Sequence, residues 1–330
     1  MVRIFVALLV SALFIQFFAL TGEAIPMRYE YEQMHMGTLF RIVLYSSDAL
    51  AAQEAARRAF FRIEQLEAVM SSYREDSELR AVQQHAFDSP QVLSPDLYAV
   101  LDRSLQLSRI MGGAFDITVR PFVLMWRRAR DEGVLPAKNL LSRESQRVGF
   151  DLILLNPRTQ SLRFRVPRVE LDLGGIGKGY AADEALAVLN ECQLPSALVY
   201  AGGDIRVGAP PPGRKGWSVA LGEGVKQGRE MSLKDCAIAS SGDAYQFVEI
   251  EGIRYSHIID PRTGLGVVGL RKATVIAPEA TTADALATAL SILGPEEGFR
   301  RISSLDGVSA EFVHYPNGVR NALWSEGFPQ

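Results

Sequence analysis

Asp284 and Thr288 are residue types that can bind a cation, and they lie four apart in the alanine-rich stretch "TTADALATAL". In a helix this spacing places the carboxylate and the hydroxyl on one face. Both are hard oxygen ligands of the kind that Mg²⁺ prefers. An Asp stabilised by a helix N-terminus and a Thr bonded back to the helix backbone give the same pattern. Taken alone, the pair favours this structural interpretation.

Residues 171–180, "LDLGGIGKGY", combine four glycines with Asp172 and Lys178. The stretch lies between an expected strand and an expected helix, where backbone N–H groups can hold anionic oxygens. It is not a P-loop, because Asp172 and Gly179 stand where that motif needs Gly and Ser or Thr. Its glycine spacing does not fit the dinucleotide fingerprint either. A tight strand-to-helix turn explains the glycines equally well, but a lysine in such a loop favours phosphate binding.

His257 is one of four histidines and ends a β-rich stretch just before a turn, in "RYSHIIDPRTG". A histidine at this place can act as a general acid or base. It can equally hydrogen-bond to the turn as a structural residue. The residues alone leave both roles open.

Two aromatic residues could stack on a flat ring: Tyr73 in "SSYRED" and Phe115 in "GGAFDITVRPFVLMW". Stacking on either side of a ring is a common use of such side chains in binding sites. Aromatic side chains are more often part of a core, however. Composition alone therefore favours packing for both.

The segments that must position these residues alternate between strand and helix patterns. Strands are expected at 38–45 and 197–201, and a hairpin around Glu251-Gly252. Helices are expected after Asp48, from N-cap Ser94 to Gly112-Gly113, over 181–190, and from a cap at Thr281 or Thr282 to Gly294. Because there is no internal repeat or long linker, the pattern predicts one catalytic body of intermixed helices and strands.

Composition excludes some classes of function. The chain has 330 residues, 48% of them hydrophobic, which is enough for a large core. The formal net charge is −3 and there is no long basic run, so nucleic-acid binding is not expected. Cys192 and Cys236 are the only cysteines and do not have a metal or redox spacing.

Residues 1–24 have the pattern of a secretory signal peptide. Arg3 precedes a largely apolar run over residues 4–20, and the small residues Gly22 and Ala24 fit a cleavage site. An uncleaved N-terminal membrane anchor is the alternative, although the run is at the short end of what spans a bilayer. In either case residues 25–330 are expected outside the cytoplasm.

The motifs occur along the chain in an order that resembles the FAD:protein FMN transferase (ApbE) family. They are "MGTLF", "SSYREDSEL", "GGAFDITVRPFVLMW", "LDLGGIGKGYAAD", "ALVYAGGDIRVG", "SSGDAYQFVEIEGIRYSHIIDPRTG" and "ATVIAPEATTADALATALSILG". The resemblance runs from about Met36 to Gly294, which is nearly the whole chain after the signal segment.

The resemblance implies an α+β fold similar to the T-fold, a single catalytic body whose two lobes of mixed helices and strands surround an FAD cleft. It implies transfer of FMN from FAD to a Thr or Ser hydroxyl of an acceptor protein, with release of AMP and with Mg²⁺, or Mn²⁺, on the pyrophosphate. Acceptors are expected to carry a motif resembling Asp-Gly-x-Ser/Thr-Gly-Ala/Ser-Thr and to be flavin-bearing subunits of membrane redox complexes on the periplasmic side.

The resemblance also implies roles for individual residues. The expected FAD contacts are Met36, Tyr73, Ala114, Phe115, Asp116, Asp172, Lys178 and the backbone of Ile259. The expected metal ligands are Asp284, Thr288 and the carbonyl of Gly175. His257 is the candidate base for the acceptor hydroxyl, because an imidazole pKa of about 6.5 suits that role near neutrality. Asp284 is the second candidate.

The sequence departs from the family's pattern at Gly177, Tyr200 and Ile117, and none of these positions is a ligand. Two other functions fit the same residues. An FAD pyrophosphatase would use water in place of the acceptor hydroxyl and release FMN and AMP. A non-enzymatic carrier would only store FAD, although the retained Asp284, Thr288 and His257 favour an enzyme.

Overall fold

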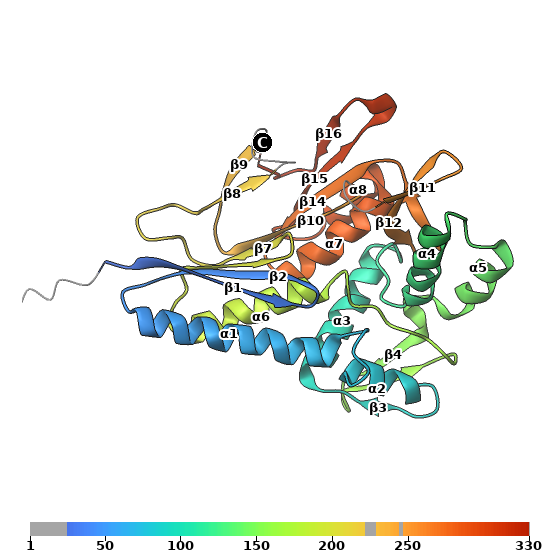
Figure 1. The fold of residues 1–330 in the computed structure, drawn as a ribbon, viewed down its shortest axis with the longest axis horizontal. Helices are drawn as coiled ribbons and strands as arrows, with labels where there is room; N and C mark the ends of the chain where they lie inside the picture. The colour runs from blue at the N-terminus through green and yellow to red at the C-terminus, as the bar shows by residue number, and fades with distance from the viewer. Residues whose placement is uncertain (1–24, 222–228, 244–246, 330) are drawn as a thin grey trace, which may run out of the picture.

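The computed structural model describes residues 25–221, 229–243 and 247–329 (Figure 1). Residues 1–24, the expected signal peptide or anchor, lie outside the described residues. Within the described ranges, no helix combines the length and apolar character needed to cross a membrane. Helices and strands are intermixed along the chain, and most of the longer strands belong to one large sheet.

Eight strands form this sheet, and every neighbouring pair in it is antiparallel. In spatial order they are β1 (Met27–His35), β2 (Thr38–Ser46), β6 (Ala197–Ala201), β7 (Asp204–Val207), β10 (Cys236–Gly242), β14 (Arg271–Ala277), β15 (Ser309–His314) and β16 (Asn321–Trp324). The pairing of β2 with β6 joins segments that are far apart in the sequence. The sheet therefore brings the N-terminal and C-terminal parts of the chain together.

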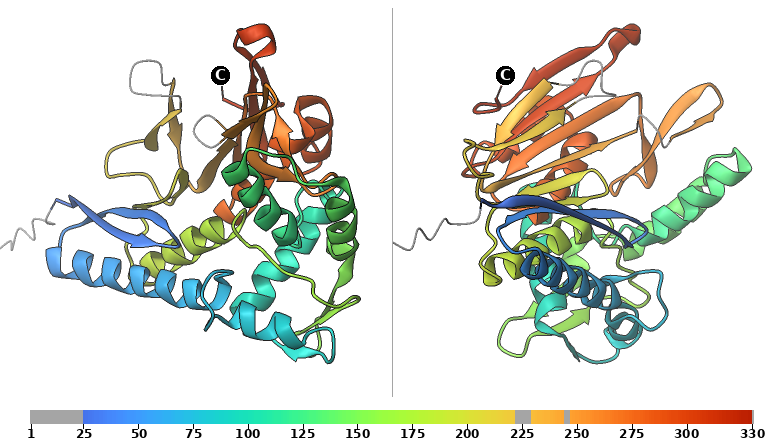
Figure 2. Two further views of the ribbon diagram at one scale, coloured as in Figure 1. Left: turned by 45° about the vertical axis from the view of Figure 1, so that its right-hand side comes forward. Right: turned by 60° about the vertical axis from the view of Figure 1, so that its left-hand side comes forward.

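Three helices cover one face of the sheet: α1 (Ala49–Met70), α6 (Gly177–Glu191) and α7 (Ala280–Leu293) (Figures 1 and 2). Alternate residues of β2, Phe40, Ile42 and Leu44, are fully buried in the main core. α7 is buried on almost all sides, as expected for a helix that is rich in Ala and Leu all round. This burial holds α7 between the sheet and α6.

The opposite face of the sheet is partly covered by the hairpin of β8 (Trp217–Leu221) and β9 (Arg229–Leu233). Trp217 and Met231 from the hairpin pack with Val43, Val207 and Ile276 of the sheet. This smaller core lies away from the helices.

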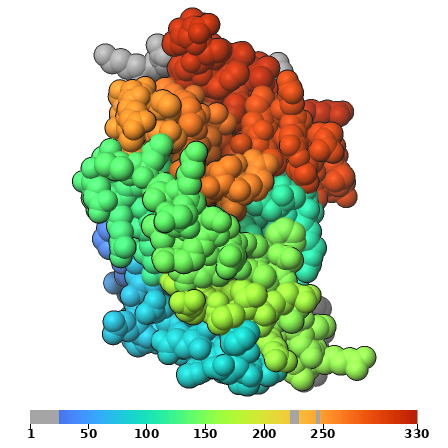
Figure 3. Space-filling view, turned by 90° about the vertical axis from the view of Figure 1, so that its right-hand side faces the viewer, coloured from blue at the N-terminus to red at the C-terminus, as the bar shows by residue number. Residues whose placement is uncertain are grey.

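The remaining elements form the rest of the body, in which the green α4 and α5 adjoin the orange β11–β13 in Figure 3. The helices are α2 (Glu78–His85), α3 (Pro95–Ile110), α4 (Arg120–Glu132), α5 (Lys138–Glu144) and α8 (Pro295–Ile302), with short 3₁₀ turns η1 (Ser145–Arg147), η2 (Phe150–Leu152) and η3 (Pro316–Gly318). Two three-stranded sheets complete the described strands: one is β3 (Gln91–Val92), β5 (Ser161–Phe164) and β4 (Ile153–Asn156), and the other is β11 (Phe247–Ile250), β12 (Ile253–Asp260) and β13 (Leu265–Val268).

Three local predictions are confirmed. The carboxylate of Asp48 caps α1 by accepting hydrogen bonds from two backbone N–H groups of its first turn. Ser94 caps α3, with Pro95 as its first residue. The turn at Glu251 and Gly252 joins β11 to β12, and both residues have positive φ as such hairpin turns require.

The predicted cap of α7 is wrong. Thr281 and Thr282 both lie inside the helix, which begins at Ala280. The acceptor for its first N–H groups is instead the carboxylate of Asp183, on α6. Sequence-based capping rules look only for local acceptors, and this acceptor comes from another helix.

Candidate functional site

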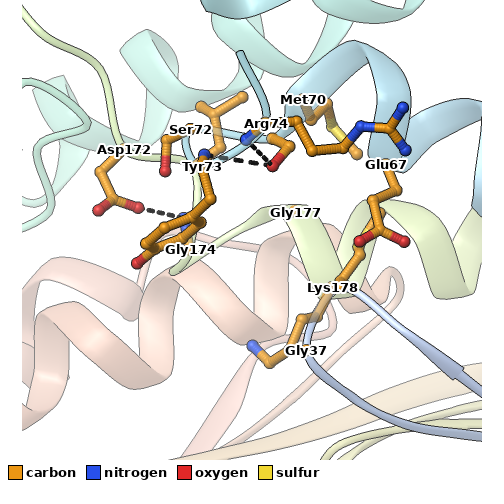
Figure 4. Close-up of a pocket in the computed structure, with 13 residues that line it drawn as sticks. Gly37, Glu67, Met70, Ser72, Tyr73, Arg74, Asp172, Gly174, Gly177 and Lys178 are labelled. Atoms are coloured by element: carbon orange, nitrogen blue, oxygen red, sulfur yellow. Dashed lines mark hydrogen bonds between the residues drawn. The ribbon is translucent and has the colours of Figure 1, made fainter. Parts of the chain in front are cut away.

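A cavity of about 520 Å³ opens between the end of α1, the β1–β2 turn and the glycine-rich stretch (Figure 4). Four of the predicted FAD contacts line it: Met36, Tyr73, Asp172 and Lys178. A cavity of this volume is in the range of small-molecule binding sites. The fold therefore brings together residues that are far apart in the sequence.

Two tight turns position the side chains on one wall of the cavity. Met36 and Gly37 both have positive φ, which is the geometry of a two-residue hairpin turn between β1 and β2. Tyr73 follows the end of α1, where the Ser71 hydroxyl accepts hydrogen bonds from the N–H groups of Tyr73 and Arg74 at 3.2 and 3.1 Å. Both turns are local features that the sequence specifies.

Lys178, in the first turn of α6, lies between two carboxylates. Its Nζ is 3.1 Å from Oδ2 of Asp204 and 3.0 Å from Oδ2 of Asp284. The backbone N–H of Gly179 also donates to Oδ2 of Asp284, at 3.3 Å. We call Lys178, Asp204 and Asp284 the charge triad. It links α6, the start of β7 and α7 beside the cavity.

The charge triad has one negative charge more than its ammonium can balance. Burial opposes the charged form of Lys178, but the charges of Asp284 and Asp204 outweigh it and raise the pKa of the lysine. Burial, with the charge of Asp284, raises the pKa of Asp204 to about 7. Oδ2 of Asp204 is buried, and its contact with Lys178 is an ion pair at 3.1 Å without good hydrogen-bond geometry. A site with these properties favours an added cation.

One predicted metal ligand, Asp284, belongs to the charge triad, and the other two, Thr288 and Gly175, lie close to each other near it. Asp284 and Thr288 share one face of α7, and a Cβ placed on Gly175 would lie 3.4 Å from the Thr288 hydroxyl oxygen. Carboxylate, hydroxyl and carbonyl oxygens are the donor types that Mg²⁺ takes, together with water and substrate phosphates. No cluster of three or more His, Cys, Asp or Glu side chains placed to hold a metal occurs in the described residues. The residues present fit a cation that shares its ligands with a substrate.

The glycines of the stretch serve different purposes. A Cβ on Gly179 would lie 2.2 Å from the carbonyl oxygen of Ala280, so this glycine allows α6 and α7 to approach. Gly177 lines the cavity and has only ordinary contacts around it. Gly174 is exposed, and its N–H donates to the Asp172 carboxylate at 2.9 Å. At Gly179, the close neighbour is therefore another helix and not a ligand.

Ala114, Phe115 and Asp116 form a buried loop behind the cavity. The Asp116 carboxylate accepts hydrogen bonds from the N–H and hydroxyl of Thr118, and burial raises its pKa. The Phe115 ring lies 3.4 Å from where a Cβ on Gly175 would be. None of the three lines the cavity, and their contact with FAD stays a prediction.

His257 and Ile259 line a second cavity of about 300 Å³, together with Trp126, Arg127 and Arg130 of α4, Val123 and Phe247. His257 is exposed, although the fold buries both of its neighbours. Arg127 connects the two cavities, because its guanidinium donates a hydrogen bond to the hydroxyl of Tyr73. The predicted base thus shares its cavity with one predicted FAD contact, Ile259, and lies outside the first cavity, which Met36, Tyr73, Asp172 and Lys178 line.

Two residues of the site were not predicted. Asp204 belongs to the charge triad, and its signal was visible as a carboxylate directly after Gly202-Gly203 at the end of a strand. Arg120 is buried, lies 5.3 Å from the Tyr73 ring centre and has two nitrogen atoms without a hydrogen-bond partner among the described residues. In the sequence, Arg120 precedes a proline at the start of a helix, and nothing there indicates its contact with Tyr73.

Comparison with known proteins identifies the family. The model of the ApbE family matches residues 36–312. An FAD:protein FMN transferase of Treponema pallidum (strain Nichols) is 33% identical over 318 residues, which cover 91% of this chain and 88% of that protein. An FAD:protein FMN transferase of Vibrio cholerae serotype O1 is 31% identical over 81% of this chain and 83% of that protein.

Solved structures agree with the sequence comparison. The flavin transferase ApbE from Vibrio cholerae superimposes with a TM-score of 0.81 at 27% identity, over 92% of this chain and 98% of that one. The apo form of the Pseudomonas stutzeri flavinyl transferase ApbE has the same TM-score at 25% identity, over 92% and 96% of the two chains. The expected α+β fold is confirmed, and the chain belongs to the ApbE family.

Proposed function

We propose that this protein is an FAD:protein FMN transferase that moves FMN from FAD to a Thr or Ser hydroxyl of an acceptor protein. The observation that carries the proposal is the charge triad, which borders a cavity of about 520 Å³ in a chain of the ApbE family. The surplus negative charge of the triad suits a Mg²⁺ ion that also binds the substrate's pyrophosphate.

Residues of α6 hold the Asp284 carboxylate in place. The Gly179 N–H and the Lys178 ammonium both donate to Oδ2 of Asp284, and no described residue donates to its Oδ1. Oδ1 of Asp284, the Thr288 hydroxyl and the Gly175 carbonyl would hold the ion. When bound, the ion supplies Lewis-acid stabilisation of the charge that develops on the pyrophosphate oxygens. Lys178 adds a positive charge next to the same group.

The transfer step exchanges one P–O bond for another. The acceptor oxygen bonds to the phosphorus of the FMN half, the P–O bond to the AMP half breaks, and the hydroxyl proton passes to His257. His257 suits this role because its cavity adjoins the first one through Tyr73 and Arg127. The acceptor segment then enters from the side of α4 and β12, and the flavin occupies the side of Tyr73 and Met36.

The test uses purified protein, FAD, Mg²⁺ and an acceptor domain with an Asp-Gly-x-Ser/Thr-Gly-Ala/Ser-Thr motif. Intact-mass spectrometry is expected to show one FMN added to the acceptor, with equimolar AMP. Free FMN and an unmodified acceptor would show a pyrophosphatase instead. FAD that stays bound and intact would show a carrier.

We further propose that the protein works outside the cytoplasm and that flavin-bearing subunits of membrane redox complexes are its acceptors. The charged and apolar pattern of residues 1–24 supports export. Cell fractionation and the mass of the mature N-terminus test this. A chain that begins after Ala24 would show cleavage, and an intact chain in the membrane fraction would show an anchor. Full-length protein confined to the cytoplasm would contradict export.

A further inference from the structure

Asp183 forms a second connection between α6 and α7, next to the charge triad. Its Oδ1 accepts a hydrogen bond from the N–H of Ala280 at 2.9 Å. Its Oδ2 accepts from the N–H of Thr281 at 2.8 Å and from the Thr281 hydroxyl at 2.6 Å. The carboxylate thus caps the N-terminus of α7 from outside that helix.

The connections between the two helices are reciprocal. Asp183 of α6 accepts from backbone N–H groups of α7, and Asp284 of α7 accepts from the backbone N–H of Gly179 of α6. Gly179 and Asp183 are four apart and lie on the same face of α6. Between these two links the helices are in direct contact, because there is no room for a Cβ on Gly179.

Asp183 also joins this helix pair to the sheet. Its Oδ1 accepts from Nε of Arg206 at 2.9 Å, and the same guanidinium donates to the carbonyls of Val207 and Cys236. Arg206 lies two residues after Asp204 on β7, so both side chains project from the same face of the sheet. One carboxylate therefore connects all three elements that supply the charge triad.

We propose that Asp183 is a positioning residue for the divalent cation: it fixes α7 against α6 and so sets Asp284 and Thr288 opposite Gly175 and Lys178. Asp183 does not line the cavity. Without its carboxylate, the N–H groups of Ala280 and Thr281 and the Nε of Arg206 lose the acceptor described here, while the Arg206 guanidinium keeps its bonds to the two sheet carbonyls. The first turn of α7, which leads to Asp284, then keeps the hydrogen bond from Arg103 to the Thr282 hydroxyl and the contacts of Asp284 itself with Lys178 and Gly179.

This inference rests on the proposed metal site, and its test measures the metal alone. Mn²⁺ binding to the purified full-length protein is measured from the electron paramagnetic resonance signal of free Mn²⁺. In Asp183→Ala the dissociation constant for Mn²⁺ is expected to rise by about 10–100-fold, as for other residues that orient metal ligands. FAD affinity in the presence of EDTA, measured by flavin fluorescence, is expected to change by less than about threefold, because the cavity wall is intact.

Two further variants separate positioning from folding. Thr281→Val removes one donor to Asp183 and should weaken Mn²⁺ binding to a smaller degree, while Thr281→Ser keeps the hydroxyl and should retain wild-type affinity. Asp96→Asn is the matched control, because Asp96 also accepts from an arginine, Arg62, and from Tyr180 of α6, but these hydrogen bonds do not involve α7. It is expected to lower thermal stability without changing Mn²⁺ affinity.

Unchanged Mn²⁺ affinity in folded Asp183→Ala would overturn the inference. The inference would also be overturned if Asp96→Asn lost as much Mn²⁺ affinity as Asp183→Ala, or if Asp183→Ala lost FAD affinity to the same degree. It would likewise fail if the wild-type protein bound no Mn²⁺. If Asp183→Ala does not fold, the Mn²⁺ affinities of Thr281→Val and Thr281→Ser are compared instead. Equal affinities in these two variants would overturn the inference. Failure of FMN transfer in wild-type protein whose Mn²⁺ affinity depends on Asp183 would count against the proposed function alone.

Discussion

At the residue scale, Lys178 is the positive charge between Asp204 and Asp284. Replacement by Met would leave two buried carboxylates next to each other with no counter-charge. We expect Lys178→Met to lower the free energy of unfolding by about 3 kcal/mol in EDTA, and Mg²⁺ to restore part of this loss. Urea unfolding with and without Mg²⁺ measures both effects. Arg57→Met removes one partner of an exposed ion pair with Glu54 and serves as the control. It should change neither the free energy of unfolding in EDTA nor the effect of Mg²⁺ on it.

The titration of Asp204 gives a pH prediction for the metal-free protein. Its pKa is raised from 3.8 to about 7 by burial and by the charge of Asp284, so the folded state holds this proton more tightly than the unfolded state does. The group therefore stabilises the fold fully below the unfolded pKa, and this contribution is lost as the pH rises toward the folded pKa. Unfolding free energies in EDTA should decline from about pH 4 to pH 7. The decline should be smaller in Asp204→Asn, and identical pH profiles for the two proteins would contradict the assignment.

At the element scale, the contact between α6 and α7 depends on Gly179. A Cβ on this residue would lie 2.2 Å from the Ala280 carbonyl oxygen, so Gly179→Ala must push the helices apart. We expect a loss of about 2 kcal/mol in the free energy of unfolding, together with weaker Mn²⁺ binding. Gly177→Ala is the matched substitution two residues away, where the nearest atom to a Cβ is 3.9 Å distant. Thermal unfolding of both variants tests this, and equal melting temperatures would show that the helices do not need the close approach.

Elements were predictable from the sequence where their determinants are local. The caps of α1 and α3, the β11–β12 turn and β2 depend on residues within a few positions of one another. β1 was missed although Tyr29 and Tyr31 alternate with Glu30 and Glu32, which is the pattern of a half-buried strand. The cap of α7 was missed because Asp183 is 97 residues away from Ala280 in the sequence.

The same reasoning applies to the candidate site. Met36, Tyr73, Asp172 and Lys178 were predicted through resemblance to a family, and the structure places all four on one cavity. Asp204 needed the structure, because only the pairing of β6 with β7 turns its strand toward Lys178. The sequence shows that Asp204 is charged, but only the fold shows that Lys178 is its partner.

At the scale of the whole molecule, β1 closes one edge of the large sheet and ends in the turn that lines the cavity. It pairs with β2 from Met27 to His35, and Tyr29 and Tyr31 pack against the core. A chain that starts at Ile25 should be monomeric and bind FAD. A chain that starts at Thr38 should aggregate through the exposed edge of β2 and lose FAD binding. Size-exclusion chromatography and flavin fluorescence compare the two, and equal behaviour would show that β1 is dispensable.

The segments around the cavity and the charge triad span the chain from Met36 to Asp284. During synthesis, a polypeptide therefore contains Met36 long before it contains Asp284. A chain that retains flavin must therefore have been synthesised and folded at least as far as residue 284. Fragments that end earlier should stay colourless, which gives a simple visual assay for the completeness of the fold.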